Sequence, residues 1–290
     1  MTQHVWFITG SARGFGRALA VAALKTGDFV VATARKPDQL ADLVEQFGSH
    51  VLPIALDVTD AHAAAAAFAA AAERFDRVDV VVNNAGYANI APIETGSTDD
   101  FRRQFETNFW GVYNVSRAAL PLLRKQGAGT IVQFSSIGGR VGCTPGLGSY
   151  QAAKFAVDGF TRVLASEIAP FGIRCLVVEP GGFATDWAGA SMEIREIPAE
   201  YDPTVGTLAR MMGTEATQAG DPKRAGEILV NVIKRRHLPS HLLLGANAVR
   251  MALAYSERQI AESNTWRGVS ASADFDQDYP VVFPKDKPAE

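Results

Sequence analysis

Tyr150 and Lys154 are the two side chains whose spacing most directly suggests proton chemistry. The run Tyr-Gln-Ala-Ala-Lys separates them by three residues, so a helix carries both on one face. Free tyrosine has a pKa near ~10; an adjacent ammonium favours the phenolate, and lowering that pKa to ~7 takes roughly 4 kcal/mol. The pair can therefore exchange a proton with a substrate oxygen, although the same spacing also occurs in ordinary surface helices.

Hydroxyl and amide side chains elsewhere in the chain can complete such a site. Ser135 and Ser136 end an apolar run that begins at Ile131, which places two hydroxyls at the end of an expected strand. Asn108 lies in the run Glu-Thr-Asn-Phe-Trp-Gly, inside an expected helix. Asparagine is mildly unfavourable in a helix interior, so its presence there favours a specific role.

Glycines near the start of the chain predict a phosphate-binding turn. The run Thr-Gly-Ser-Ala-Arg-Gly-Phe-Gly, from Thr9 to Gly16, follows a strand-like segment and precedes a helix-like one. Glycines let the backbone approach a pyrophosphate closely, and the helix N-terminus supplies N–H donors and partial positive charge. Taken by itself, the run also fits an ordinary strand–helix turn.

Short apolar runs alternate with helix-like segments along the chain, as in repeated βαβ units. Most runs are continuously apolar, which is typical of a parallel sheet covered on both faces. We expect strands at Val5–Thr9, Phe29–Thr33, Val51–Leu56, Val78–Val82, Thr130–Phe134, Arg174–Val178 and Leu242–Leu244, and helices near 15–25, 38–47, 60–75, 99–124, 149–169, 222–236 and 246–262. They predict a single α/β domain, a doubly wound Rossmann-type parallel sheet of about seven strands with helices on both faces.

The predicted domain spans residues 1–262, and the polar segment 263–290 is expected to be an extended C-terminal tail. Residues 183–220 break the alternation, and a segment of this length inside a compact domain is typical of a substrate lid. Candidate pocket residues from this lid and the 142–148 loop are Cys143, Leu147, Trp187, Met192, Ile194, Tyr201, Met211 and Met212. This apolar, adaptable set favours a hydrophobic alcohol or ketone, although the same residues can instead pin the lid to the core.

These motifs, in this order, resemble those of the short-chain dehydrogenase/reductase family over roughly residues 4–262. The glycines match the family's Thr-Gly-x-x-x-Gly-x-Gly, and Tyr150 and Lys154 match its Tyr-x-x-x-Lys. The resemblance implies that Tyr150 is the general acid/base and that Lys154 holds ribose hydroxyls, supported through water by Asn108. It implies that Ser136 holds the substrate oxygen, with Ser135 as the alternative. Ser136 precedes Tyr150 by fourteen positions where thirteen is usual, so we expect a bulge near Cys143-Thr144-Pro145.

The same resemblance implies a nicotinamide cofactor. An acidic residue after the second strand would favour NAD, whereas Arg35 can hold the 2′-phosphate of NADP(H). Solvated surface arginines and, for Asp57, a helix cap are the alternatives. The implied cofactor-binding residues are Gly10, Ser11, Arg13, Gly14, Phe15, Gly16, Arg35, Asp57, Val58, Asn84, Ala85, Gly86, Tyr150, Lys154, Pro180, Gly181, Phe183 and Thr185, of which Thr185 is expected to contact the carboxamide.

Composition narrows the classes of partner. The formal charge is −3, with 28 basic and 31 acidic residues, and no Lys/Arg run predicts a nucleic-acid face. No apolar run approaches the ~18 residues of a membrane span, and the first residues lack the basic region of a signal peptide. Cys143 and Cys175 lie far apart, the histidines form no metal motif, and a reducing compartment, the cytoplasm, is expected.

We therefore predict an NADP(H)-dependent oxidoreductase that interconverts a carbonyl and a primary or secondary alcohol on an apolar small molecule. A non-catalytic NADP(H)-sensing regulatory protein on the same scaffold is the alternative. Enoyl reductases of the family separate the Tyr and Lys by six residues, and its sugar-nucleotide epimerases have a different glycine pattern. The resemblance also implies a homodimer or homotetramer joined by the helices that hold Asn108 and Tyr150.

Overall fold

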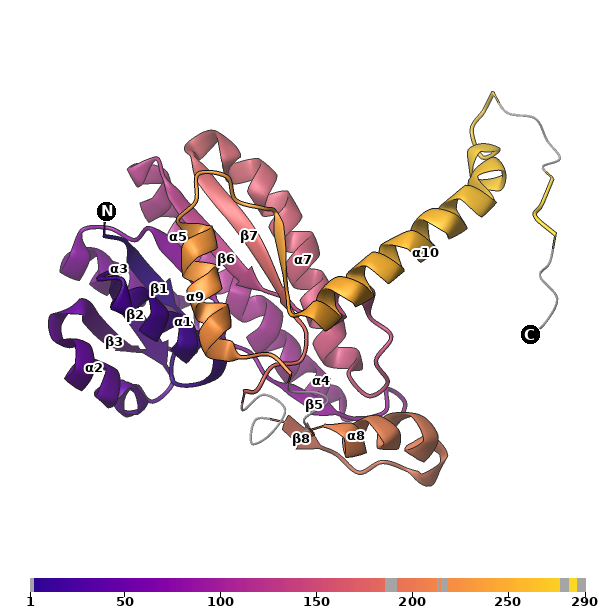
Figure 1. Cartoon of the computed structure of the whole chain (residues 1–290), viewed down its shortest axis with the longest axis horizontal. Helices are drawn as coiled ribbons and strands as arrows, with labels where there is room; N and C mark the ends of the chain where they lie inside the picture. Colours follow the sequence, from indigo (N-terminus) through magenta and orange to yellow (C-terminus); the bar gives the residue numbers. More distant parts are fainter. Residues whose placement is uncertain (1–2, 186–191, 213, 215–218, 277–281, 286–290) are drawn as a thin grey trace.

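Seven parallel strands form the centre of the molecule (Figure 1). The structure is a computed structural model that describes residues 3–185, 192–212, 214, 219–276 and 282–285. From one edge of the sheet to the other, the strands are β3 (Val51–Ala55), β2 (Phe29–Ala34), β1 (Val5–Ile8), β4 (Val80–Asn83), β6 (Gly129–Phe134), β7 (Ile173–Pro180) and β9 (His241–Leu244). The expected strands are confirmed, with ends that differ by one or two residues.

The order of the strands determines where a ligand-binding crevice can form. The chain runs from β1 outward through β2 to β3 and then returns to β4 on the other side of β1. Beyond the carboxyl ends of β1 and β4, the connections therefore leave in opposite directions, and a crevice forms where they separate. This doubly wound topology confirms the predicted fold class.

Helices cover both faces of the sheet (Figure 1). The core on one face joins the strands to α1 (Gly14–Lys25), α2 (Ala41–Phe47) and α9 (Pro222–Ile233). The core on the other face joins them to α3 (Ala61–Phe75), α5 (Gly111–Gln126) and α7 (Gly148–Ile168). Single-turn helices η1 (Pro37–Leu40), η2 (Gly48–His50) and η4 (Ala169–Phe171) join neighbouring elements. The central strands are buried on both sides, which explains their continuous apolar runs.

The helix expected over 99–124 is three segments instead of one. α4 (Thr98–Phe105) passes into a π-helical turn, η3 (Glu106–Trp110), and then into α5. Asn108 lies in this π-helical turn and is fully buried. A π turn inserts one residue into the helix and is frequent at functional sites, but apolar periodicity does not reveal it.

The C-terminal helix is longer than expected. α10 (Ala246–Ala271) continues past residue 262, so the predicted extended tail over 263–290 is wrong for residues 263–271. Ser, Asn, Thr and Gly in this stretch are weak helix formers, yet an existing helix lengthens at low cost because each added residue gains a hydrogen bond. α10 projects away from the body, with Ala248 and Ala252 as its buried residues (Figure 1).

The described parts of the 183–220 segment hold short elements. β8 (Met192–Ile194) pairs with β5 (Ala88–Ile90) in a separate two-stranded sheet. η6 (Ala199–Tyr201), η7 (Asp202–Gly206) and α8 (Thr207–Met211) follow. Trp187, one of the expected pocket residues, lies outside the described residues.

Candidate active site

A cavity of about 1260 Å³ opens at the carboxyl ends of the central strands. Of the predicted site residues, its wall contains Gly10, Arg13, Gly14, Phe15, Arg35, Asp57, Val58, Asn84, Ala85, Gly86, Ser136, Tyr150, Lys154, Pro180, Gly181, Phe183 and Thr185. Ser11, Gly16 and Asn108 lie behind this wall, all three buried. The structure thus brings the predicted residues together, with these three as its support.

The glycine loop is shaped by backbone conformation and close packing. Gly10 and Gly14 have positive φ angles of 67° and 57°, which side chains disfavour. A Cβ at Gly16 would collide with the Gly10 carbonyl and the Asn84 amide. Asn84 Nδ2 donates to the Thr9 carbonyl at 2.9 Å, which joins the ends of β1 and β4. α1 then begins at Gly14 without a side-chain cap or an acidic residue in its first turn, so its N-terminus is available to an anion.

Three basic side chains line the cavity: Arg13 from the glycine loop, and Arg35 and Lys36 from the residues that follow β2. All three are exposed, and within the described residues none of them makes an ion pair. Unpaired cations beside an uncapped helix N-terminus fit the phosphates of a dinucleotide.

Asp57 is not a helix cap. Its carboxylate accepts hydrogen bonds from the backbone N–H and hydroxyl of Thr59, at 3.0 and 2.8 Å. Asp60 caps α3 instead, accepting from the N–H groups of His62 and Ala63. The capping alternative for Asp57 is therefore wrong, and Asp57 instead lies in the cavity wall with the other residues expected to bind the cofactor.

Ser136 and Tyr150 face one another. The Ser136 hydroxyl hydrogen-bonds Tyr150 and accepts from the Gly138 N–H at 3.0 Å. Ser135 instead donates to the Lys154 carbonyl at 3.0 Å, which holds its hydroxyl against the backbone of α7. Ser136 is therefore the better placed of the two serines to share a substrate oxygen with Tyr150.

Burial controls the charges of Tyr150 and Lys154. It raises the pKa of Tyr150 to about 12, against the opposing effect of the hydrogen bond from Ser136. It lowers the pKa of Lys154 to about 8. Lys154 Nζ donates to the Phe134 carbonyl at 2.7 Å and lies 5.7 Å from the centre of the Tyr150 ring. Desolvation of the phenolate is thus the largest effect on the Tyr150 pKa, whereas the expected lowering draws in addition on the positive charge of an oxidised nicotinamide.

Asn108 supports the floor of the site through Tyr87. Its Oδ1 accepts from the Tyr87 N–H at 3.1 Å, and its Nδ2 donates to the Tyr87 carbonyl at 2.9 Å. A Cβ at Gly86 would lie 2.5 Å from Asn108 Oδ1 and 3.6 Å from Lys154 Nζ. Both side chains therefore converge on Gly86, without a direct hydrogen bond between them.

The extra residue between Ser136 and Tyr150 is accommodated in a left-handed turn. Gly142 and Cys143 have φ angles of 62° and 63°. Gln151 then pins the loop, donating to the Thr144 hydroxyl at 2.8 Å and accepting from its N–H at 3.2 Å. The extra residue is taken up inside the loop, so the two ends of the loop keep their places and Ser136 still contacts Tyr150.

The expected substrate pocket is partly correct. Met211 and Met212 line the cavity, whereas Leu147, Met192 and Tyr201 pack in the core cluster around Tyr150. Cys143 and Ile194 are exposed and outside the cavity wall. The wall also includes residues that sequence reasoning missed, among them Tyr87, Val141, Asn247 and Met251. Asn247 and Met251 lie on α10, and no motif connects that helix to the site.

Comparison with known proteins agrees with this geometry. A family model for short chain dehydrogenase matches residues 4–195. Oxidoreductase BOA17 of Botryotinia fuckeliana is 48% identical over 271 residues, 93% of this chain and 98% of that protein. A crystal structure of a short-chain dehydrogenase from Streptomyces avermitilis has a TM-score of 0.88 at 36% identity, covering 94% of this chain and 99% of that one. An alcohol dehydrogenase from Thermococcus sibiricus, complexed with 5-hydroxy-NADP, has a TM-score of 0.69 at 27% identity, covering 84% and 96%.

The similarity extends over nearly the full length of the chain and includes the sheet, the glycine loop and the segment with Tyr150 and Lys154. Among the described residues, no group of three or more metal-binding side chains gathers, and no helix is both long and apolar enough to cross a membrane. The chain belongs to the short-chain dehydrogenase/reductase family of oxidoreductases.

Proposed function

We propose that the protein is an NADP(H)-dependent oxidoreductase that interconverts a carbonyl and a primary or secondary alcohol. The observation that carries the proposal is the Ser136–Tyr150 hydrogen bond in the cavity that also contains Lys154 and the glycine loop. A carbonyl oxygen placed between the two hydroxyls receives a hydrogen bond from Ser136 and a proton from Tyr150.

Each group has a separate task in this proposal. The nicotinamide supplies the hydride or accepts it, at the substrate carbon. Ser136 orients the substrate oxygen, and Tyr150 gives the proton in reduction or takes it in oxidation. Lys154 holds ribose hydroxyls and supplies a positive charge near the phenol, while Asn108 and the Tyr87 backbone hold the adjoining floor. Thr185 contacts the carboxamide.

The preference for NADP(H) rests on charge at the end of β2. Arg35 and Lys36 occupy the positions where an acidic side chain would repel a 2′-phosphate, and Arg13 lies across the same part of the cavity. The similar alcohol dehydrogenase from Thermococcus sibiricus is bound to an NADP derivative, which agrees with this preference.

The substrate is proposed to be apolar. Val141, Met211, Met212 and Met251 contribute aliphatic and thioether surface to the cavity, and methionine adapts to irregular apolar shapes. Ser136 and Tyr150 supply hydroxyl groups in the same cavity. A ketone, aldehyde or alcohol on a hydrophobic body fits this division.

The protein is also proposed to form a homodimer or homotetramer through an aromatic face on α4, η3, α5 and α7. Phe101, Trp110 and Phe155 are 39%, 44% and 42% exposed. Ring contacts join Phe101, Phe105, Phe109, Trp110, Tyr113 and Phe160 along these helices. Exposed apolar surface of this kind is typical of a subunit interface.

NADPH consumption with a panel of apolar ketones and aldehydes tests the function. Tyr150→Phe should lower kcat/KM by about 10²–10⁴-fold while NADPH still binds, because the proton donor is lost. Tyr201→Phe is the matched control, since its hydroxyl bonds Glu94 away from the cavity. NADPH binding without turnover in the wild type would favour the sensing protein, and no nucleotide binding would overturn the proposal.

A further inference from the structure

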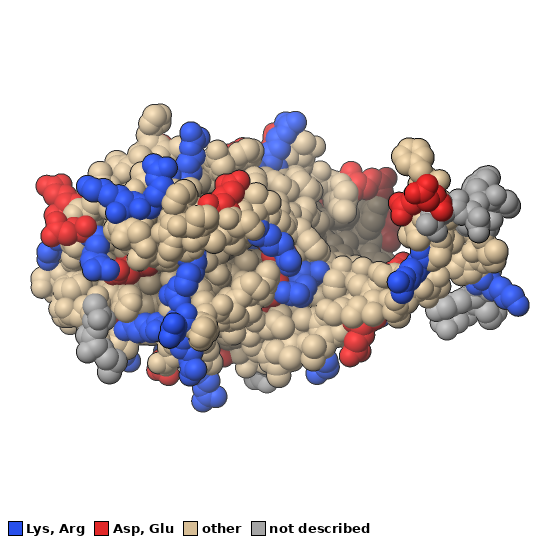
Figure 2. All heavy atoms as spheres, turned by 90° about the horizontal axis from the view of Figure 1, so that it is seen from above, with Lys and Arg blue, Asp and Glu red and all other residues tan. Residues whose placement is uncertain are grey.

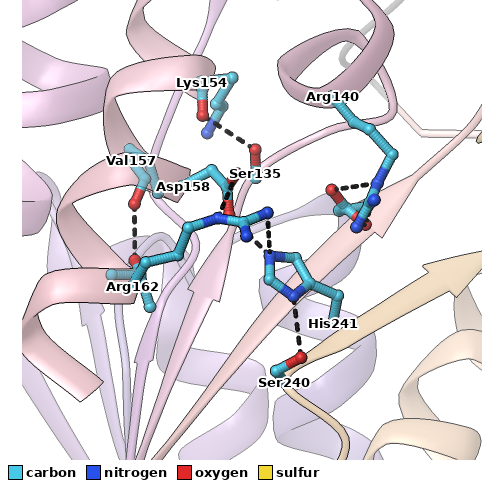
Figure 3. A network of polar contacts seen from close by, with 10 residues as sticks. Ser135, Arg140, Lys154, Val157, Asp158, Arg162, Ser240 and His241 are labelled. Carbon is cyan, nitrogen blue, oxygen red and sulfur yellow. Dashed lines mark hydrogen bonds and ion pairs between the residues drawn. The ribbon is translucent and has the colours of Figure 1, made fainter. Parts of the chain in front are cut away.

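An ion pair between a fully buried carboxylate and a partly exposed arginine joins two segments that border the cavity. Glu179, next to last in β7, is fully buried, and Arg140 reaches it from α6 (Gly138–Val141). Arg140 Nε donates to both carboxylate oxygens at 2.9 and 3.0 Å, and Nη2 donates to Oε2 at 2.8 Å. Figure 3 shows the Arg140 guanidinium pointing into this contact. The planar fork of arginine fixes both distance and orientation.

The ion pair ties together the segments that adjoin Ser136. The Ser135 N–H donates to the Val178 carbonyl at 2.9 Å, and the Ile137 N–H donates to the Pro180 carbonyl at 3.0 Å. Ser136 is therefore held between two residues that are hydrogen-bonded to β7, and the ion pair adds a side-chain link one turn further on. All three links connect the same two segments.

The turn after Ser136 depends on such tertiary links. α6 has four residues, and a helix of that length is not stable by itself. Ile137 and Val141 pack against Ala248 and Ala252 of α10, which closes its other side. Polar contact from β7 and apolar contact from α10 thus fix the turn that carries Ser136.

Stability alone does not explain why charges are buried here. A buried ion pair is costly to desolvate and often contributes no more than apolar residues of the same volume. What the pair does supply is geometry, at a point where a misplacement of about 1 Å can lower a rate 10²-fold.

We propose that Arg140 and Glu179 are positioning residues that hold the Ser136 hydroxyl in register with Tyr150. The proposal rests on the function proposed for Ser136. Neither Arg140 nor Glu179 lines the cavity, so the ion pair acts through the turn that joins Ser136 to Arg140.

A double-mutant cycle in catalysis tests this. The pair is neutralised by Arg140→Met with Glu179→Gln, so that no unpaired charge stays buried, and is combined with Ser136→Ala. kcat/KM for a ketone should fall on the order of 10–100-fold in the pair variant. In the Ser136→Ala background, the same change should lower the residual kcat/KM by less than about twofold, because the hydroxyl to be positioned is gone. The single variant Arg140→Lys, with Glu179 retained, should keep more of the wild-type folding stability than of the wild-type kcat/KM. Lysine keeps the positive charge of arginine but lacks its planar fork.

Lys234 and Asp28 provide a matched control. Their side chains are 23% and 1% exposed, against 25% and 1% for Arg140 and Glu179, and they lie outside the cavity wall. Lys234→Met with Asp28→Asn should change thermal stability and leave kcat/KM of the folded protein unchanged in both backgrounds. If the pair variant lowers kcat/KM by the same factor with and without the Ser136 hydroxyl, the positioning role of the ion pair is overturned and the role of Ser136 is not. An unchanged kcat/KM in Ser136→Ala would overturn the roles of both the serine and the ion pair.

Discussion

Tyr150 can be identified from its sequence motif, but the pKa of its phenol depends on the surrounding structure. The raised pKa of its phenol keeps Tyr150 protonated at neutral pH, which is the form that donates a proton in carbonyl reduction. The phenolate needed for alcohol oxidation requires additional positive charge close by. Lys154 supplies that charge below a pH of about 8, and oxidised nicotinamide adds a second.

The direction of the Lys154 shift gives a pH dependence. Its pKa is lowered to about 8, so the ammonium is complete at pH 6–7 and is lost as the pH rises through 8. We therefore expect kcat/KM for ketone reduction to be constant on the acidic side and to fall above pH 8. Stopped-flow NADPH oxidation from pH 6 to 10 measures this profile. Lys154→Met should be slow and lack the alkaline fall; a retained fall in that variant would assign it to another group.

Arg35 governs the choice of nucleotide in our proposal. Arg35→Asp removes a charge-assisted hydrogen bond to the 2′-phosphate and adds repulsion, so the Kd for NADPH should rise about 10–100-fold relative to that for NADH. Fluorescence titration of both nucleotides measures the ratio. Arg102→Asp, an exposed arginine on α4, is the control and should leave it unchanged. An unaltered ratio in Arg35→Asp would contradict the assignment.

At the scale of elements, close packing of the glycine loop leaves no room for a side chain at Gly16. Gly16→Ala places a methyl group against the Gly10 carbonyl and the Asn84 amide, so the loop must shift. Overpacking of this kind costs about 1–3 kcal/mol, and the Kd for NADPH should rise roughly 10–100-fold. Isothermal titration calorimetry measures the affinity.

Gly159→Ala is the matched control for that substitution. Gly159 lies inside α7 with no atoms near its hypothetical Cβ, so alanine should raise the free energy of unfolding by about 0.5–1 kcal/mol and leave NADPH affinity unchanged. Equal nucleotide affinity in the two alanine variants would show that the loop is more adaptable than its contacts indicate.

Helices and strands were predictable from the sequence where the conformational preference of the residues agrees with the pattern of burial. Strands β1, β2, β4 and β6 are largely apolar runs bounded by turn residues, and a buried parallel strand favours that pattern. The π-helical turn around Asn108 was not predictable, because it follows from the paired hydrogen bonds to Tyr87, a residue on another segment. The same holds for the last turns of α10, whose residues have weak helix preference.

At the scale of the whole molecule, charge and apolar surface are distributed differently. Figure 2 shows a face on which acidic and basic side chains are interspersed over a largely uncharged surface. The aromatic face on α4, η3, α5 and α7 is instead a concentrated apolar region. This contrast supports association of copies of the chain through that face.

Placing a charge on the aromatic face should therefore separate the subunits. Trp110→Glu buries an unpaired carboxylate in the proposed interface, so the oligomer should dissociate to smaller species at micromolar concentration. Light scattering after size-exclusion chromatography measures the mass. Leu253→Glu, at a 58% exposed position on α10, is the control and should keep the wild-type mass. An unchanged mass for the Trp110→Glu protein would show that the subunit interface does not include this aromatic face.

The sequence by itself determined the sheet, the glycine loop and the pair of side chains, Tyr150 and Lys154, that we propose for proton transfer. Those features depend on local chemistry: apolar runs that must be buried, glycines that must turn, and a tyrosine and lysine one helical turn apart. The tertiary structure placed the Ser136 hydroxyl against Tyr150 and that of Ser135 against the Lys154 carbonyl. It also joined Arg140 to Glu179 and brought Asn247 and Met251 of α10 to the cavity. Each of these depends on segments far apart in the chain, whose meeting follows from strand order and packing and not from any local pattern.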